Sequence, residues 1–374
     1  MDPRRRLRFV PVGRTRGCNF RCEFCAVHSQ FGRIRWASPE RSFEQVRDLW
    51  RQGHRIFFYT DDNFAQDRRG TLRLLRLIIR WRERSGRRPR FIIQARAEVG
   101  RDLELLGLMR RAGVTSICIG LESPIDEDLR AMRKGQSAAA MEAAVANIQR
   151  LGFYIHGMFI FGYPRADTSP PGASLTVRQR ADRYLDFIRR TRLDTIQVMK
   201  PVPLPGTDLS RRLSEAGRIY PLDQVGWDKY DGNWVVFEPD AGTSAVALQE
   251  EATRIMRRFY QARNIIKWVY IAPISPVDAG YYTVRKALEL WRAYRRERRA
   301  LRAGASRAAH LRAAVRHIAA DSLRAGWQAV KRRWRNTVWL TGAVFVLRAW
   351  RESFRRENFR ELLARCHSRR VFGT

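Results

Sequence analysis

Cysteine is scarce in this chain, with five in 374 residues. Three of the five fall within eight consecutive positions, which leaves only Cys118 and Cys366 elsewhere. Small secreted domains depend on several disulfides, and this count cannot supply such a framework. The composition therefore predicts a reduced, intracellular protein.

Long apolar runs are missing as well. The N-terminal segment MDPRRRLRFVPVG contains no apolar stretch of the length that a secretory signal requires. The apolar run Val338–Leu347 is shorter than the roughly 18 to 20 residues that cross a bilayer. We therefore expect a cytoplasmic protein, peripheral at a membrane if its basic surface binds lipid.

Acidic residues and lysine are also few. The chain has 37 Asp and Glu against 72 Lys and Arg, a net charge of +35, and only six of the basic residues are lysine. Residues 285–374 hold 24 basic and 6 acidic residues, with Trp327, Val330, Trp334 and Val338 at helical spacing. Basic amphipathic helices suit an anionic membrane surface or RNA. A helical subdomain with solvated arginines is the simpler alternative, and the sequence leaves all three open.

Six apolar segments before residue 210 have the residue types of buried strands. They are Leu7–Val12, Arg55–Tyr59, Phe91–Gln94, Ser116–Gly120, Tyr154–Phe161 and Thr195–Met199. Segments of helical periodicity separate these runs. One of them begins at Ser38 and Pro39, and others end at glycines such as Gly86, Gly113 and Gly152. Successive βα units with right-handed crossovers form a parallel sheet. We predict an α/β fold, a partial (βα)6 TIM-type barrel with a mostly α-helical C-terminal extension.

The expected organisation has three parts. These are a core barrel over residues 1–210, a barrel-closing, substrate-side segment over 211–275, and a basic Arg/Trp-rich helical extension over 276–374. Trp227, Tyr230 and Trp234 in the middle segment offer aromatic contacts for a substrate. An equally good interpretation is that these rings cover the open edge of the barrel.

The three clustered cysteines form the segment CNFRCEFC, with three residues between Cys18 and Cys22 and two between Cys22 and Cys25. Thiolates are soft ligands suited to iron–sulfur clusters and zinc. A loop with three thiolates can hold three corners of a cubane cluster and leave the fourth iron open. His28 follows Cys25 by three residues, so a closed zinc site is an alternative. A redox-active Cys-x-x-Cys pair would not need the third thiol.

Polar side chains stand where several of the predicted strands end. They are Asp61, Asp62, Asn63, Arg96, Glu98, Glu122 and Ser123. Because the carboxyl ends of parallel strands meet at one edge, we expect these groups to converge on a cavity beside the cysteine loop. For each of them, a strand-end ion pair or a helix cap is the alternative.

These features resemble the radical S-adenosylmethionine (radical SAM) enzymes. TDDNF, GLESPIDEDLRAMRKGQ, GMFIFGYP, PVPLPGT and WDKYDGNWVVFEP extend the resemblance over about residues 7 to 262, to the subgroup often joined to cobalamin-binding domains. The resemblance implies a [4Fe-4S] cluster whose open iron binds SAM, and an electron donor such as flavodoxin or ferredoxin. One electron would cleave SAM to a 5′-deoxyadenosyl radical that abstracts hydrogen from a substrate.

The resemblance also implies the site residues. Cys18, Cys22 and Cys25 would be the metal ligands, and the SAM contacts would be Phe24, Asp61, Asp62, Arg96, Glu122 and Ser123. Phe24 would lie against the adenine. Asp61 or Asp62 would hold the methionine amino group, at a position where many members have a glycine-glycine-glutamate pattern.

The remaining three contacts would bind the other parts of SAM. Arg96 suits the methionine carboxylate through a charge-assisted pair, whereas Glu122 and Ser123 match a position that contacts the ribose or the methionine part. No residue is predicted to act as a catalytic acid or base.

Two departures from the family pattern disfavour particular reactions of the family. Only 17 residues precede Cys18, which disfavours cobalamin-assisted methylation unless a partner brings the cofactor. Two further cysteines are too few for a second cluster, which weakens sulfur insertion.

We expect a radical SAM enzyme that acts on an unidentified small metabolite or a lipid or natural-product precursor. A tRNA-modifying radical SAM enzyme is the second possibility. A non-catalytic zinc or iron–sulfur protein that binds nucleic acid is the alternative of another class. The polar strand ends favour an enzyme, because a binding module does not need them.

Overall fold

The computed structural model describes residues 9–165, 175–260, 275–300, 314–316, 318–323 and 326–327. The chain divides into two compact units, of which one contains Met1–Phe259 and the other is Tyr260–Ser353. The three-part division expected from the sequence stays a prediction. Val330, Trp334, Cys366 and the run Val338–Leu347 lie outside the described residues.

A parallel sheet of six strands forms the centre of the first unit. In spatial order the strands are β1 (Val10–Val12), β4 (Ile56–Tyr59), β5 (Arg90–Arg96), β6 (Val114–Glu122), β7 (Tyr154–Ile160) and β8 (Thr195–Met199). Each strand pairs with the next one predicted along the chain. The α/β fold with six βα units is confirmed.

The strands are apolar because helices and loops bury the sheet. Phe57, Phe91, Ile117, Ile119 and Ile155 are at most 1% exposed. The strand register places these five residues on one face of the sheet, whereas Phe58, Ile92 and Cys118 on the other face are half-buried. This burial explains why composition alone located all six strands.

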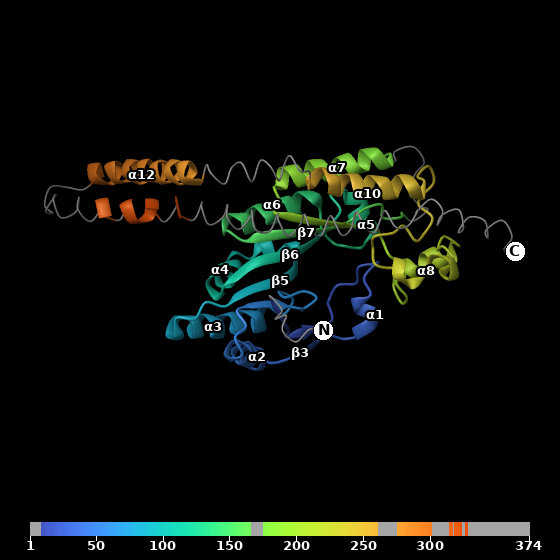
Figure 1. The fold of residues 1–374 in the computed structure, drawn as a ribbon, viewed down its shortest axis with the longest axis horizontal. Coiled ribbons are helices and arrows are strands. Elements are labelled where there is room, and N and C mark those ends of the chain that lie inside the picture. The colour runs from blue at the N-terminus through green and yellow to red at the C-terminus, as the bar shows by residue number, and fades with distance from the viewer. Residues whose placement is uncertain are drawn as a thin grey trace. The chain divides into compact units, whose positions relative to one another are not determined.

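Helices follow the strands and cover the sheet (Figure 1). The main ones are α2 (Pro39–Arg51), α3 (Arg68–Ser85), α4 (Leu103–Ala112), α6 (Ala138–Arg150), α7 (Val177–Thr191) and α10 (Ala245–Phe259). The Ser38 hydroxyl accepts the Arg41 amide at 3.2 Å and Pro39 opens α2, as the sequence predicts. Gly86 and Gly113 end α3 and α4 with φ of 67° and 103°, a conformation that favours glycine.

Several short elements surround the carboxyl edge of the sheet, and the sequence did not predict them. They are β2 (Thr15–Arg16), β3 (Arg35–Trp36), α1 (Val27–Phe31), η1 (Ala97–Arg101), α5 (Asp126–Ala131), α8 (Asp208–Glu215), α9 (Leu222–Val225) and η2 (Trp227–Lys229). β2 and β3 pair antiparallel and bracket the cysteine loop. One or two turns carry too little periodicity for sequence reasoning.

The second unit contains α12 (Ser275–Ala300). Across the described ranges, none of the helices combines the length and apolar character that crossing a bilayer demands.

Candidate functional site

The three clustered cysteines lie in the loop between β2 and α1, at the carboxyl edge of the sheet. Cys18, Cys22 and Cys25 are half-buried free thiols, and the Cys25 amide donates to the Cys22 carbonyl at 3.0 Å in a tight turn. Burial raises the pKa of Cys18 and of Cys25. Binding of a metal replaces such thiol protons.

This donor set suits an iron–sulfur cluster. Within the ranges that the structure describes, no three His, Cys, Asp or Glu side chains are grouped around one point as ligands of a single metal ion. Each thiolate of a cubane cluster binds a different iron, so its three ligands need not converge on one point. Three free thiols on one loop therefore match the chemistry of such a cluster.

The loop is anchored from β4 by two neighbouring carboxylates. Asp61 is fully buried and accepts the Arg14 amide at 3.0 Å, the Thr15 amide at 2.7 Å and the Thr15 hydroxyl at 2.6 Å. Asp62 accepts the Gly17 amide at 2.9 Å. Both side chains thus fix the backbone directly before Cys18, and their contact with SAM stays a prediction.

Arg96 connects the end of β5 to the cysteine loop. Its Nη1 lies 3.4 Å from the Cys22 Sγ, and its guanidinium carbon lies 3.7 Å from the centre of the Phe20 ring. Its other nitrogens donate to the Glu98 carboxylate and to the Lys134 carbonyl. Arg96 is only 7% exposed, so a positive charge is held beside a thiol in a site of low solvent access.

Glu122 forms a buried ion pair at the end of β6. Lys134 Nζ lies 2.7 Å from Glu122 Oε1, and the two side chains are 5% and 10% exposed. Glu122 has a φ of 61°, next to a register shift in the pairing of β6 with β7. A Cβ on Gly120 would lie 2.5 Å from Glu122 Oε1, so a larger residue there would displace this carboxylate.

Lys134 is a site residue that the sequence analysis missed. It lies in the segment GLESPIDEDLRAMRKGQ, but a loop residue after a short helix shows no periodicity that marks it. In the structure it reaches back to Glu122, while its carbonyl accepts Arg96. One loop therefore joins the ends of β5 and β6.

Ser123 and Phe24, also predicted as SAM contacts, have partners within the chain. The Ser123 hydroxyl donates to Asp128 Oδ2 at 2.8 Å and accepts the Ile125 amide at 3.1 Å. Phe24 is half-buried, and its ring contacts Tyr163 edge-on at 6.2 Å between centroids. Their contacts with SAM stay predictions.

A cavity of about 260 Å³ lies beside the cysteine loop. Its lining includes Asn19, Phe20, Asn63, Gln66, Arg96 and Glu98. The structure thus brings the loop and the ends of β4 and β5 to one cavity, whose lining contains three of the seven polar residues expected there, Asn63, Arg96 and Glu98. Of the predicted SAM contacts, which all lie in the described part of the chain, Arg96 alone lines this cavity.

Lys200, which directly follows β8, is a buried lysine that the sequence did not single out. It is 2% exposed, and burial lowers its pKa to about 7. The unfolded chain keeps the lysine proton up to a pH of roughly 10. Between pH 7 and 10 the unfolded state therefore binds more protons, and stability rises with pH.

Replacing Lys200 by Met is expected to remove this pH dependence. Urea unfolding at pH 7 to 10 measures the free energy of unfolding, and the wild type should gain up to about 1.4 kcal/mol per pH unit relative to Lys200→Met. Lys286→Met, at a half-exposed lysine, is the matched control and should follow the wild type. If the free energy of unfolding changes with pH in the same way for the wild type and for Lys200→Met, the expectation is contradicted.

Residues 12–168 match a family model described as "Radical SAM superfamily". The "Hopanoid C-2 methylase" of Rhodopseudomonas palustris is 28% identical over 54% of this chain and 37% of its own length. The "Uncharacterized methyltransferase sll1242" of Synechocystis is 26% identical over 60% of this chain and 44% of its own length. The chain thus spans less than half the length of these curated relatives.

Among solved structures, one similar chain is the radical S-adenosylmethionine methyltransferase TsrM from Kitasatospora setae, in a structure with tryptophan substrate and a SAM analog bound. The identity is 18%, the TM-score is 0.49, and the match covers 59% of this chain and 40% of that chain.

Proposed function

We propose that this chain is a radical SAM enzyme, as the match of residues 12–168 to that family model supports, that Cys18, Cys22 and Cys25 hold a [4Fe-4S] cluster, and that the enzyme cleaves SAM to modify a small apolar metabolite or lipid precursor. The observation that carries the proposal is the group of three free, half-buried thiols at the carboxyl edge of the sheet, with a buried guanidinium 3.4 Å from Cys22 Sγ. When bound, the cluster supplies the electron that cleaves SAM to a 5′-deoxyadenosyl radical.

The chain's own residues prepare this chemistry. The carboxylates of Asp61 and Asp62 hold the loop in shape through backbone amides. Arg96 lowers the electrostatic cost of negative charge on the thiolates, because opposite charges attract strongly in a site of low dielectric constant. We further propose that SAM meets Phe24, Glu122 and Ser123 on the barrel side of the loop.

The names of the relatives favour methyl transfer, of which only the cobalamin-assisted form without a partner to bring the cofactor was disfavoured from the sequence. One relative is named for a hopanoid, a lipid, and this name supports an apolar substrate. Since the chain covers less than half of both relatives named above, we propose that cobalamin, if the reaction needs it, is supplied from outside residues 1–374.

Label transfer tests the reaction class. The reconstituted, reduced chain is incubated with cell extract and SAM labelled in its methyl group, with and without added cobalamin, and lipid and RNA fractions are counted. Label in the lipid fraction that depends on Cys22 supports methylation of an apolar substrate. Label in RNA would instead support the tRNA-modifying alternative, and no label in either fraction would contradict methyl transfer.

Helix α12 offers one specific observation about a partner. Its large apolar side chains Tyr281, Val284, Leu288 and Trp291 are spaced three or four residues apart and are 39% to 59% exposed. Arg285 and Arg292 are exposed on the same helix. We propose that this stripe binds an anionic lipid surface, because an apolar helix face flanked by arginines suits the membrane interface.

Flotation with anionic vesicles tests the lipid surface. Leu288→Ser is expected to lower vesicle binding several-fold, because it removes a central apolar contact. Leu103→Ser, at an exposed leucine of α4 in the other unit, is the control and should bind as the wild type does. Equal binding by both variants, or binding to RNA alone, would overturn the proposal.

A further inference from the structure

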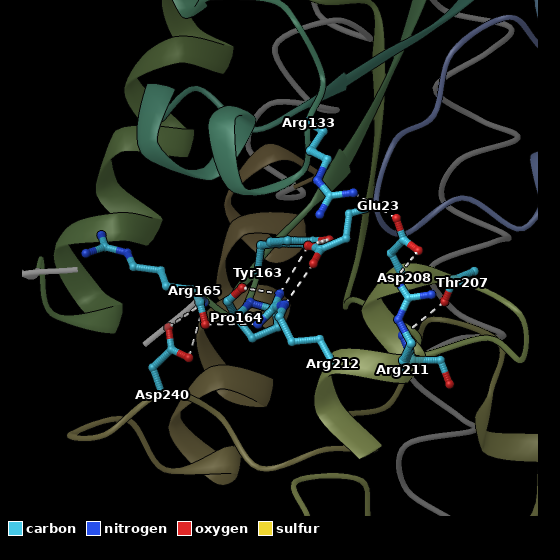
Figure 2. Close-up of polar contacts among 11 residues, drawn as sticks. Glu23, Arg133, Tyr163, Pro164, Arg165, Thr207, Asp208, Arg211, Arg212 and Asp240 are labelled. Atoms are coloured by element: carbon cyan, nitrogen blue, oxygen red, sulfur yellow. Dashed lines mark hydrogen bonds and ion pairs between the residues drawn. The ribbon is translucent and has the colours of Figure 1, made fainter. Parts of the chain in front are cut away.

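Glu23, between the second and third cysteines of the loop, is held by two side chains from distant parts of the chain (Figure 2). Its carboxylate accepts the Tyr163 hydroxyl at 2.6 Å, Arg212 Nε at 2.7 Å and Arg212 Nη2 at 3.1 Å. Glu23 is 5% exposed. A carboxylate this buried is stable only with partners that satisfy its oxygens.

The backbone of Glu23 is held as firmly as its side chain. Its amide donates to the Met132 carbonyl at 3.0 Å, and its carbonyl accepts the Leu209 amide at 3.1 Å. Met132 follows α5, and Leu209 lies in the first turn of α8. The polar groups of Glu23 thus bind three regions around the loop, which are the end of α5, helix α8 and the segment after β7.

Arg212 also binds the segment that follows β7. Its Nη1 donates to the Arg165 carbonyl at 3.0 Å and its Nη2 to the Pro164 carbonyl at 3.1 Å, both on the segment that follows β7. A guanidinium presents its donors in a fixed plane, so these bonds orient it against Glu23. Burial and the adjacent carboxylate raise the pKa of Tyr163, which keeps its hydroxyl as a donor. The loop is therefore tied to β7 and α8 through one ion pair.

We propose that the Glu23–Arg212 pair positions the cysteine loop and sets the reduction potential of its cluster. The inference rests on the proposed function, since it concerns the cluster that Cys18, Cys22 and Cys25 would hold. Glu23 is a neighbour of Cys22 in the chain and two residues from Cys25. Reduction adds a negative charge to the cluster, so a nearby carboxylate disfavours it and a nearby guanidinium favours it. The two side chains therefore act on the potential with opposite signs.

Substitution of each partner separates this electrostatic role from a general loss of structure. Midpoint potentials are measured by EPR during redox titration of the full-length, reconstituted chain. Glu23→Gln leaves the Arg212 charge in place and is expected to raise the midpoint. Arg212→Gln leaves the carboxylate and is expected to lower it. The double variant should return toward the wild type, because both charges are gone.

Arg211 provides the matched control. It neighbours Arg212 on α8 but pairs with Asp208 at 2.7 Å on the surface (Figure 2). Arg211→Gln also removes one positive charge, and the wild-type midpoint is expected to remain. Equal midpoints for all loaded variants, or shifts of one sign for Glu23→Gln and Arg212→Gln, would overturn the inference.

Hydrogen exchange on the iron-free chain gives a readout that does not need the cluster. Residues 17–31 are expected to exchange faster in Glu23→Gln and Arg212→Gln than in Arg211→Gln, with Tyr163→Phe intermediate because it removes a single hydrogen bond. Unchanged exchange in all four variants would contradict the positioning role. A wild-type chain that takes up no cluster overturns the proposed function and this inference together, whereas a loaded wild type with insensitive midpoints overturns the inference alone.

Discussion

Replacing Cys22 by Ala is expected to abolish cluster assembly. The thiolate of Cys22 is one of three that the loop offers, and a cubane cluster with one open iron has no spare protein ligand. Iron and sulfide content and the visible absorption of the reconstituted chain measure the result. Cys18→Ala and Cys25→Ala should give the same loss.

Cys118→Ala is the matched control, because it also removes one thiol. Cys118 lies in the middle of β6 and not at the carboxyl edge, and burial raises its pKa to about 11. The iron and sulfide content of Cys118→Ala should equal that of the wild type. Retention of the cluster in Cys22→Ala, or its loss in Cys118→Ala, would contradict the assignment of the cluster to the cysteine loop.

Replacing Arg180 by Met is expected to cause a large loss of stability, because it breaks a buried ion pair. Arg180 on α7 pairs with the fully buried Asp128 on α5, which also accepts the Ser123 hydroxyl. The variant leaves a buried carboxylate without its cation, which costs about 3–5 kcal/mol of unfolding free energy. Urea unfolding of the iron-free chain measures this value.

Two further variants decide the cause. Asp128→Leu combined with Arg180→Met should recover most of the loss, since no unpaired charge remains. Arg189→Met, which removes an exposed ion pair with Asp186 on the same helix, should change stability by less than about 1 kcal/mol. If Arg180→Met costs no more than Arg189→Met, the buried pair does not stabilise the fold as described.

The sheet was predictable because its strands are runs of apolar and β-branched residues, which give a strong local signal. All six strands were located, and β8 was placed at its observed bounds, Thr195–Met199. Helix ends were found where capping chemistry is local, as at Ser38 and Gly86. These features depend on neighbouring residues, which a sequence shows directly.

The partners of the site residues were not predictable in the same way. Arg212 reaches Glu23 across 189 positions, and Tyr163 reaches it across 140. Lys134 pairs with Glu122 only because α5 and its following turn bring the chain back over the strand end. No periodicity encodes such contacts. The sequence thus located the edge where the chemistry lies but not the ion pairs that shape it.

Cleavage of SAM is tested most directly by the formation of 5′-deoxyadenosine. The chain is reconstituted anaerobically with iron and sulfide, reduced, mixed with SAM and analysed by chromatography. We expect 5′-deoxyadenosine from the wild type and none from Cys18→Ala, Cys22→Ala or Cys25→Ala. A wild-type chain that binds a single zinc ion and leaves SAM intact would contradict this expectation.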